Sequence, residues 1–490
     1  MSEGHYIQVL LPLRLEWDPW YYTASPVPVG ERVRVRFGRA IYTGVVIAVS
    51  DAPVGVDASK VKSTESAGSG LEPILPSELE FWRFIADYYL CSPGEVYKYV
   101  YPAARAEVEL KKSRRLKAPL DKAAGAVVTF DAWKPLLLPE TGSAVELRHR
   151  TEEVLASGRD VLVLSPGAAK ESYAEVRDRA ALARSSEPSV IEGGRFDVFL
   201  PFTKLGLVII HNEEDTRYKQ ASISPRYNAR DAALQLARIH GAAVILTSDS
   251  PSLETFLNVR TGKYSGAVSK TSGFCSPDKE KGRPVNKKGS ICTPHRTTII
   301  DTSAELRKNG MIGSFSRKLH SMMSDAFSQK GRVLLLLPWK DTDDIEIEAR
   351  RHFPEARTKL VVKPLGSKID YGKFALVALL RAEYLTGKSD FRADERFIRL
   401  LGSLSRECAN LVIQTASSEH PAFTRSLEDL LEERRTLGLP PFTRLVELRR
   451  PGEAQPLRQW FLRKDSHLQS EKKKIAASVP PGCYLDVDPV

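Results

Sequence analysis

The chain has 490 residues, of which 42% are hydrophobic, enough for three or four domains and ordinary for a soluble globular protein. No apolar run approaches the ~18 residues of a membrane span, and the five scattered cysteines contain no C-x-x-C pair, so neither a membrane partner, a disulfide framework nor a zinc site is expected; free thiols fit a reducing cytoplasm. The net charge of +11 favours a polyanionic partner, most simply nucleic acid, over a surface that merely happens to be basic.

Residues 5–60 are predicted to be β-structure. The stretch MSEGHYIQVLLPL has no basic n-region, so we interpret it as a first strand rather than a signal peptide. In RVRVRFG, which ends at Gly38, basic and apolar residues alternate, and this predicts a strand with Arg32, Arg34 and Arg36 on one face. YTGVVIAVS follows as a second strand, so a small barrel or sheet is expected.

A helix is predicted from Pro76 to Leu90, with Ser77 as its cap. Its apolar face is expected to hold Leu79, Trp82, Phe84, Ile85 and Tyr88. Residues 111–124, KKSRRLKAPLDKAA, combine a basic cluster with proline and alanine, and we interpret them as a linker or arm.

From about residue 125 the pattern changes to apolar strands followed by amphipathic helices. The runs DVLVLS, LGLVII and AAVILTS are continuously apolar, which is typical of parallel strands buried on both faces, and they predict a doubly wound α/β domain over residues 125–298. After a polar segment at 268–296, a second α/β pattern with RTTIID, RVLLLLP, FALVALLRA and NLVIQT covers residues 299–419. A tail, 420–490, opens with the charged helix SLEDLLEERRTLG. The predicted fold class is α/β, with a small β-rich N-terminal domain and a small α+β C-terminal domain.

Two α/β lobes in tandem in a basic protein are typical of a helicase motor, which needs a phosphate loop. The stretch LLPETGSAVELRHR, from Leu137 to Arg150, has the strand–glycine–helix rhythm of G-x-x-x-x-G-K-[ST]. Aligned on its TGS, however, Val145 stands at the lysine and Glu146 at the Mg²⁺-holding hydroxyl. Glu140 and Glu146 would also repel a triphosphate.

Such a motor also needs an acidic magnesium motif after a buried strand. LGLVII is followed by HNEEDTRYKQ, in which His211 and Asn212 occupy the first positions and the carboxylates of Glu213 and Glu214 come later. A solvated polar loop at the end of a parallel strand is the simpler interpretation, and we prefer it to a working metal site.

Several long segments along the chain are unusual. They are FGRAIYTGVV, FWRFIADYYLCSPGEVYKYVYPA, FDVFLPFTKLGLVII, SPSLETFLNVRTGKY, HFPEAR, DFRADER, VIQTASSEHPAF, ERRTLGLPPFTRL and the terminal DVDP. Through these segments the chain resembles the primosomal protein N′ (PriA) family of replication-restart helicases over nearly its whole length. The resemblance implies a 3′-DNA-end-binding domain at residues 1–110, two RecA-like helicase lobes and a family C-terminal domain. It also implies a shortened member, because the winged-helix domain is reduced to the basic linker.

The departures from the family pattern are concentrated in the motor. The family's G-x-T-G-S-G-K-T-E keeps only its Thr-Gly-Ser core, D-E-E-H is replaced, and the arginine-rich motif is reduced to GSLSRECAN. Where the family has eight zinc-binding cysteines, only DTDD remains. The degenerate positions are Val145, Glu146, His211, Asn212, Glu213, Glu214 and Arg406. An arginine finger alone is worth roughly 10³–10⁵ in rate, and the phosphate-loop lysine and magnesium ligands are missing as well, so we expect no ATP hydrolysis and no catalytic residue. For the same reason we expect no use of ATP or magnesium. Because the cysteines are missing, we expect no use of zinc.

The DNA-end site is better preserved. By resemblance, Trp20, Tyr21, Gly38 and Lys62 form the pocket for the terminal nucleotide, with base stacking worth ~1–3 kcal/mol. Packing of Trp20 and Tyr21 in the barrel core is an equal alternative. The arginine row either follows phosphates or is a solvated strand face, and Arg226 and Arg230 either contact phosphate or pair within the domain.

The function expected from the sequence is recognition of forked or 3′-ended DNA in replication restart by a cytoplasmic monomer that assembles other restart proteins without unwinding. The main alternative is an ATP-dependent 3′–5′ helicase with unorthodox ligands. A third is a partner protein whose basic surface docks a replication protein.

Overall fold

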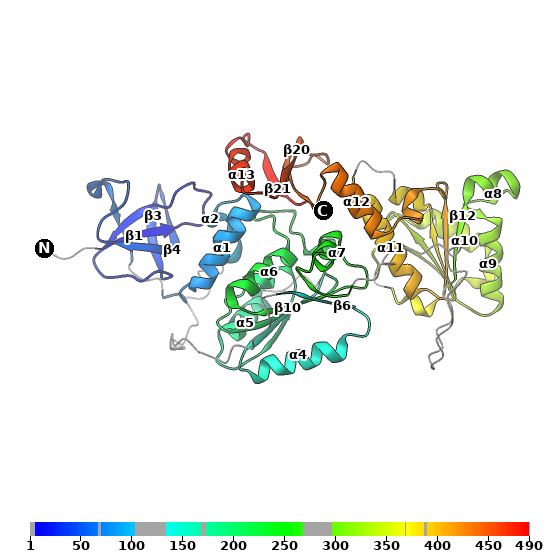
Figure 1. Ribbon diagram of the computed structural model, residues 1–490, viewed down its shortest axis with the longest axis horizontal. Coiled ribbons are helices and arrows are strands. Elements are labelled where there is room, and N and C mark those ends of the chain that lie inside the picture. The colour runs from blue at the N-terminus through cyan, green and yellow to red at the C-terminus, as the bar shows by residue number, and fades with distance from the viewer. Residues whose placement is uncertain are drawn as a thin grey trace. The chain divides into compact units, whose positions relative to one another are not determined.

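The computed structural model describes residues 5–66, 70–102, 134–167, 173–267, 296–367, 369–386 and 390–489 (Figure 1). The expected α/β fold class is confirmed, with a small β-rich N-terminal domain and two parallel sheets flanked by helices. Contacts divide the chain into unit 1, which contains Met1–Ser248, Asn258–Ala267 and Gly438–Val490, and unit 2, which contains Asp249–Leu257 and Val268–Leu437. The linker predicted at residues 111–124 and nearly all of the polar segment 268–296 lie outside the described residues. Within the described ranges no helix has the length and apolar character needed to cross a membrane.

The N-terminal strands of unit 1 form a small closed sheet. Its strands are β1 (His5–Leu10), β2 (Trp20–Thr23), β3 (Arg32–Phe37), β4 (Ala40–Ser50) and β5 (Lys62–Ser63), in the order β3-β4-β1-β2-β5. Beyond β5, the Glu65 N–H donates to the Arg34 carbonyl oxygen at 2.8 Å, and Ser66 bridges to Arg34. Because β3 and β5 are the two ends of the strand order, this pairing closes the sheet into a barrel. Inward-facing apolar residues, such as Val33 and Val35, fill it.

Two helices follow the barrel, α1 (Pro76–Tyr89) and α2 (Pro93–Val100). The predicted cap of α1 was wrong, because Pro76 is the first helical residue and Leu75 stands at the cap position. The Leu75 N–H donates to Oε2 of Glu78 at 2.9 Å, so the carboxylate reaches back and replaces a Ser77 cap.

The first parallel sheet has the strand order β11-β6-β10-β9-β7-β8. Its elements are β6 (Leu136–Leu138), α4 (Ala144–Ala156), β7 (Asp160–Leu164), α5 (Tyr173–Arg184), β8 (Val190–Gly193), β9 (Leu205–Ile210), α6 (Ala229–His240), β10 (Ala243–Thr247), α7 (Leu253–Arg260) and β11 (Ser265–Gly266). Every residue of β9 is buried, which is why this strand is apolar without alternation. The three strands predicted from continuous apolar runs are β7, β9 and β10.

The C-terminal part of unit 1 is a small antiparallel sheet in the order β20-β19-β21. Its elements are β19 (Thr443–Arg449), β20 (Arg458–Arg463), α13 (Leu468–Ala477) and β21 (Tyr484–Val487). The sheet contacts the end of α1, where Nζ of Lys472 donates to the carbonyl oxygens of Asp87 at 2.9 Å and Tyr88 at 2.7 Å. A lysine at this position satisfies carbonyls that a helix end leaves without partners.

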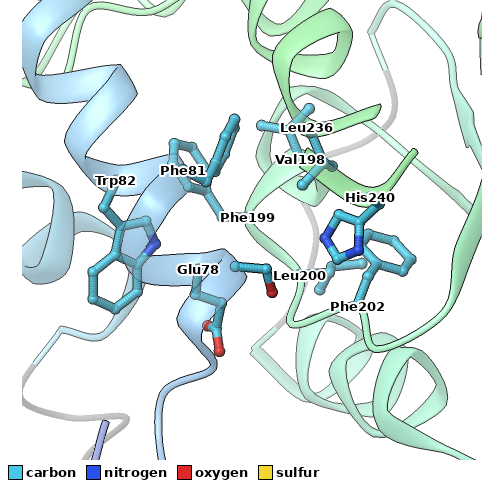
Figure 2. A pocket seen from close by; sticks show the side chains of 10 residues that line it. Glu78, Phe81, Trp82, Val198, Phe199, Leu200, Phe202, Leu236 and His240 are labelled. Carbon is cyan, nitrogen blue, oxygen red and sulfur yellow. The ribbon is translucent and has the colours of Figure 1, made fainter. Parts of the chain in front are cut away.

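Helix α1 also packs against the first parallel sheet through an aromatic contact that encloses a small pocket. Figure 2 shows Phe81 and Trp82 of α1 on one side and Phe199, Phe202 and His240 on the other. The rings of Phe81 and Phe199 lie 5.4 Å apart. Burial, with a smaller contribution from the nearby Arg159 charge, lowers the pKa of His240 to about 4, so its ring is neutral at pH 7.

Unit 2 contains the second parallel sheet, in the order β12-β18-β17-β15-β16. Its elements are β12 (Arg296–Asp301), α8 (Thr302–Lys308), β13 (Met311–Ile312), β14 (Phe315–Ser316), α9 (Arg317–Ser328), β15 (Val333–Leu337), α10 (Asp343–His352), β16 (Leu360–Pro364), β17 (Leu376–Leu380), α11 (Ala393–Glu407), β18 (Asn410–Thr415) and α12 (Leu427–Leu437). Arg434 of α12 forms a buried ion pair with Glu395 of α11 at 2.9 Å. Helix α12 therefore belongs to unit 2, and the C-terminal sheet begins after it rather than at residue 420.

Candidate functional site

The closure of the barrel brings the predicted DNA-end residues together. Strands β2 and β5 pair with Tyr21 opposite Lys62, and the Tyr21 hydroxyl donates to the Arg36 carbonyl oxygen at 3.1 Å. Gly38 follows two residues later in the turn between β3 and β4. Three separate stretches of sequence thus converge on one edge of the barrel, as a common site requires.

These residues differ in exposure. Tyr21 is 3% exposed and belongs to the barrel core, where burial raises the pKa of its phenol to about 12 and keeps it protonated as a donor. Trp20 is half-buried, whereas Lys62 is exposed. Tyr21 therefore holds the strands in place, and Trp20 and Lys62 are the side chains that a ligand can reach.

Gly38 is required by the backbone of the turn. Its φ is +60°, in the left-handed region that residues with a side chain rarely adopt, and Phe37 and Ala40 pair on either side of the two-residue loop. A Cβ added to Gly38 would meet nothing within 4 Å, so the space above the turn is open.

The predicted arginine row is not a single exposed face. Arg32 is 1% exposed, and its guanidinium lies 4.2 Å from the centre of the Tyr101 ring, beneath the helices that follow the barrel. Arg34 and Arg36 are exposed, and Arg36 pairs with Glu65 at 2.8 Å. The exposed basic residue Arg39, beside Gly38, was not among the predicted site residues, although its place in a hairpin turn is a sequence signal.

The phosphate-loop-like segment keeps the shape of such a loop. Strand β6 leads through a turn, in which Gly142 has φ +89°, into the first turn of α4. Val145, at the lysine position, is 82% exposed. Glu146, at the hydroxyl position, accepts a hydrogen bond from Nε of Arg150 at 2.9 Å on the surface of α4. Neither side chain offers a cation to a phosphate.

A carboxylate from the same loop forms a closed hydrogen-bonded cluster. Oε1 of Glu140 lies 3.1 Å from Nδ1 of His211, and Oε2 accepts from the backbone N–H of Asn212 at 3.3 Å and from the Thr247 hydroxyl. The Thr247 hydroxyl is also 3.2 Å from Nδ1 of His211. We call Glu140, His211 and Thr247 the Glu140 cluster.

The electrostatics of the Glu140 cluster favour an ionised carboxylate. Burial acts to raise the pKa of Glu140, but the hydrogen bonds from His211 and Thr247, with the His211 charge and the Asn212 N–H, outweigh burial and lower the pKa. From the sequence, Glu140 was predicted only to repel a triphosphate. Its partners come from the ends of β9 and β10, and only the sheet order brings them beside β6.

The remaining acidic residues and arginines of this region are engaged within unit 1. Glu213 is buried and pairs with Arg230 at 3.0 Å, and Arg230 also contacts Asp231 at 2.8 Å. The guanidinium of Arg226 stacks 3.5 Å from the centre of the Tyr484 ring. Arg230 therefore pairs within its domain, as in the alternative that we considered, whereas Arg226 contacts the C-terminal sheet instead of an acidic residue of its own domain.

Three further positions aligned with the motor motifs are Asn212 and Glu214 in unit 1 and Arg406 in unit 2. Asn212 adopts a left-handed φ of +47°, and Glu214 is half-buried. Arg406 is exposed on α11 of unit 2, with its guanidinium beside Gly402. Among the described residues, no group of three or more His, Cys, Asp and Glu side chains is arranged to hold a metal ion.

Comparisons with known proteins agree with the barrel domain. Residues 8–102 match the 3′DNA-binding domain (3′BD) of PriA. The chain is similar to the replication restart protein PriA of Rickettsia felis, with 27% identity over 342 residues that cover 63% of this chain and 49% of that protein. It is also similar to the PriA of Haemophilus influenzae, with 30% identity over 233 residues that cover 42% of this chain and 29% of that protein.

Among solved structures, RecG bound to a three-way DNA junction matches with a TM-score of 0.30 and 13% identity, over 70% of this chain and 44% of RecG. The chain spans about half, or less, of the length of the PriA relatives described above.

The fold defines a protein with two parallel α/β sheets and a β-barrel domain that matches a 3′DNA-binding domain. Within these bounds the chain is similar to PriA proteins, and residues 8–102 match their 3′DNA-binding domain.

Proposed function

We propose that this chain binds DNA with a 3′ end, at forked or branched structures, and acts in replication restart without hydrolysing ATP. The observation that supports DNA binding most strongly is the match of residues 8–102 to the 3′DNA-binding domain, together with the pairing of Tyr21 with Lys62 and its hydrogen bond to Arg36, two residues before Gly38. A half-buried tryptophan, an open glycine turn and an exposed lysine supply a stacking surface, close backbone approach and a phosphate contact.

The absence of ATP hydrolysis is supported by the Glu140 cluster. In a working phosphate loop, backbone N–H groups, a lysine and Mg²⁺ surround the phosphates. Here the lysine position is the exposed Val145, and the ionised Glu140 lies against the first two residues after β9. Preorganised charge is usually the largest catalytic term in such reactions, so its replacement by a negative group removes the basis for phosphoryl transfer.

At the positions expected for magnesium and zinc, the described residues do not fit these metals either. The Mg²⁺-holding positions are His211 and Asn212, and both are hydrogen-bonded to Glu140. Between β15 and α10, where the family has its zinc-binding cysteines, the chain has only a short connection containing DTDD. We propose that the protein acts without a nucleotide or metal cofactor, as a monomer that recruits other restart proteins in the cytoplasm.

Two measurements on the full chain test this proposal. Fluorescence anisotropy should show tighter, salt-sensitive binding to a fork with a free 3′ end than to blunt duplex or to the same fork with its 3′ end blocked. Phosphate release from ATP should stay at the level without protein, with or without DNA. Equal binding to all DNAs would contradict the DNA-end proposal, and DNA-stimulated phosphate release lost in Glu213→Ala would favour the helicase alternative.

A further inference from the structure

An exposed tryptophan lies beside the candidate DNA-end site. Trp17 is 58% exposed, and its ring is 6.2 Å from the ring of Phe37, which immediately precedes Gly38. The contrast with Trp82 of α1 is informative, because Trp82 is 1% exposed and stacks on Tyr97 at 5.6 Å. A tryptophan that keeps so much apolar area in water contributes little to the barrel core and leaves an aromatic face open to a ligand.

The strand and the turn that hold Phe37 also carry exposed basic residues, which a nucleic-acid surface requires. Arg34 and Arg39 are exposed on β3 and in its turn, and neither has an ion-pair partner within the described part of the chain. Two carboxylates flank Trp17 in sequence. Of these, Asp18 is partly buried near the Arg83 charge, whereas Glu16 is exposed. A bound DNA strand can therefore place its phosphates toward the turn and β3, away from Glu16.

We propose that Trp17, supported by Phe37, is a stacking platform for a nucleobase of the bound single strand, next to the nucleotide held at the Gly38 turn. The proposal rests on the proposed DNA-end binding and adds a residue that neither the sequence analysis nor the family resemblance assigned. Bases stack on aromatic rings whatever their identity, so this platform extends the contact along the strand without adding sequence preference.

The test uses the full chain and a fork with a single-stranded 3′ end. Trp17→Ala should weaken binding on the order of tenfold, whereas Trp17→Phe should lose much less, because stacking scales with the aromatic face. The slope of log affinity against log salt should be unchanged in Trp17→Ala, because no phosphate contact is lost. The matched control is Trp460→Ala, which removes a half-buried tryptophan of β20 in the C-terminal sheet and should leave the affinity unchanged.

Abasic DNA identifies the group that Trp17 contacts. Removing only the base next to the terminal nucleotide should weaken binding by the wild-type protein to about the level of Trp17→Ala, and should have little further effect on the variant. Wild-type affinity in Trp17→Ala, or equal losses from abasic DNA in both proteins, would overturn the platform while leaving DNA-end binding intact. Failure of the wild-type protein to bind any fork would overturn the proposed function, and the platform with it. A thermal melt of each variant checks folding, and Trp17→Phe keeps the test decisive if Trp17→Ala melts early.

Discussion

The barrel edge and the phosphate-loop-like region of the same unit differ in whether their polar side chains are exposed to solvent or hydrogen-bonded within the protein. At the barrel edge, Lys62 and Arg39 are exposed and the turn at Gly38 opens onto free space. In the phosphate-loop-like region, Glu140 is held by His211 and Thr247, and Glu213 is held by Arg230. A polar group already satisfied by the protein gains little from a ligand, whereas an exposed one can exchange water for it. The barrel edge therefore offers polar groups to a ligand, and the phosphate-loop-like region holds its polar groups in contacts within the protein.

The largest effect on the free energy of unfolding should come from Lys219, a buried lysine with a structural role. Nζ of Lys219 is buried, pairs with Asp486 at 2.7 Å and donates to the Val487 carbonyl oxygen at 2.6 Å. Lys219→Ala should lower the free energy of unfolding by about 3–5 kcal/mol, because it leaves the Asp486 carboxylate buried without its cation. Urea denaturation measures this, and the DNA affinity of the remaining folded protein should be unchanged. A loss of affinity without a loss of stability would place Lys219 at the DNA instead.

A smaller effect should come from His240 in the pocket of Figure 2. Its pKa in the folded state is about 4, below the ordinary value of 6.5, so between these values the unfolded chain binds the proton and the folded chain does not. Its contribution to stability should be present above pH 6.5 and lost as the pH falls toward 4, by up to about 3 kcal/mol. Denaturation from pH 7 to 4 of the wild type and of His240→Leu should show this loss in the wild type only, and parallel curves would refute it.

A still smaller effect is expected at the Glu140 cluster. Glu140→Gln keeps the shape of the side chain but removes the charge that His211 and Thr247 stabilise, so it should cost about 1 kcal/mol. Because the pKa of Glu140 is lowered in the folded state, the wild type should lose this contribution as the pH falls below the ordinary carboxyl range. Thermal melting of both proteins at pH 7 and at lower pH measures the stability cost and its pH dependence. Melting at pH 7 with an ATP analogue measures nucleotide binding. Nucleotide-induced stabilisation of the variant would show that the carboxylate alone had closed a competent loop.

The smallest effect on stability should be that of Lys62→Ala, the matched control for Lys219→Ala. Lys62 is exposed, so the free energy of unfolding should change by less than about 0.5 kcal/mol. Binding to 3′-ended DNA should nevertheless weaken, and the salt slope should fall by about one, as expected for one lost phosphate contact. An unchanged salt slope would remove Lys62 from the DNA path and weaken the contrast between the two regions.

Strands β7, β9 and β10 of the first parallel sheet were predictable because a continuous apolar run is stable only with both faces covered, whereas the short strands β8 and β11 were not predicted. The residues of LGLVII, for example, are all buried in β9. The orientation of Arg32 was not predictable in this way. Alternation places it on the face of Arg34 and Arg36, but Tyr101 and the helices after the barrel cover only its end of the strand.

The sequence alone determined the α/β class, the valine at the position aligned with a phosphate-loop lysine, and the residues that resemble a DNA-end site. Only the tertiary structure decided that Tyr21 is core while Trp20 and Lys62 are accessible, and that Glu140 meets His211 and Thr247. The physical reason is that local patterns encode burial and backbone conformation, which depend on near neighbours. The partners of a charged side chain depend on strand order, and neighbouring strands such as β6, β10 and β9 lie far apart along the chain.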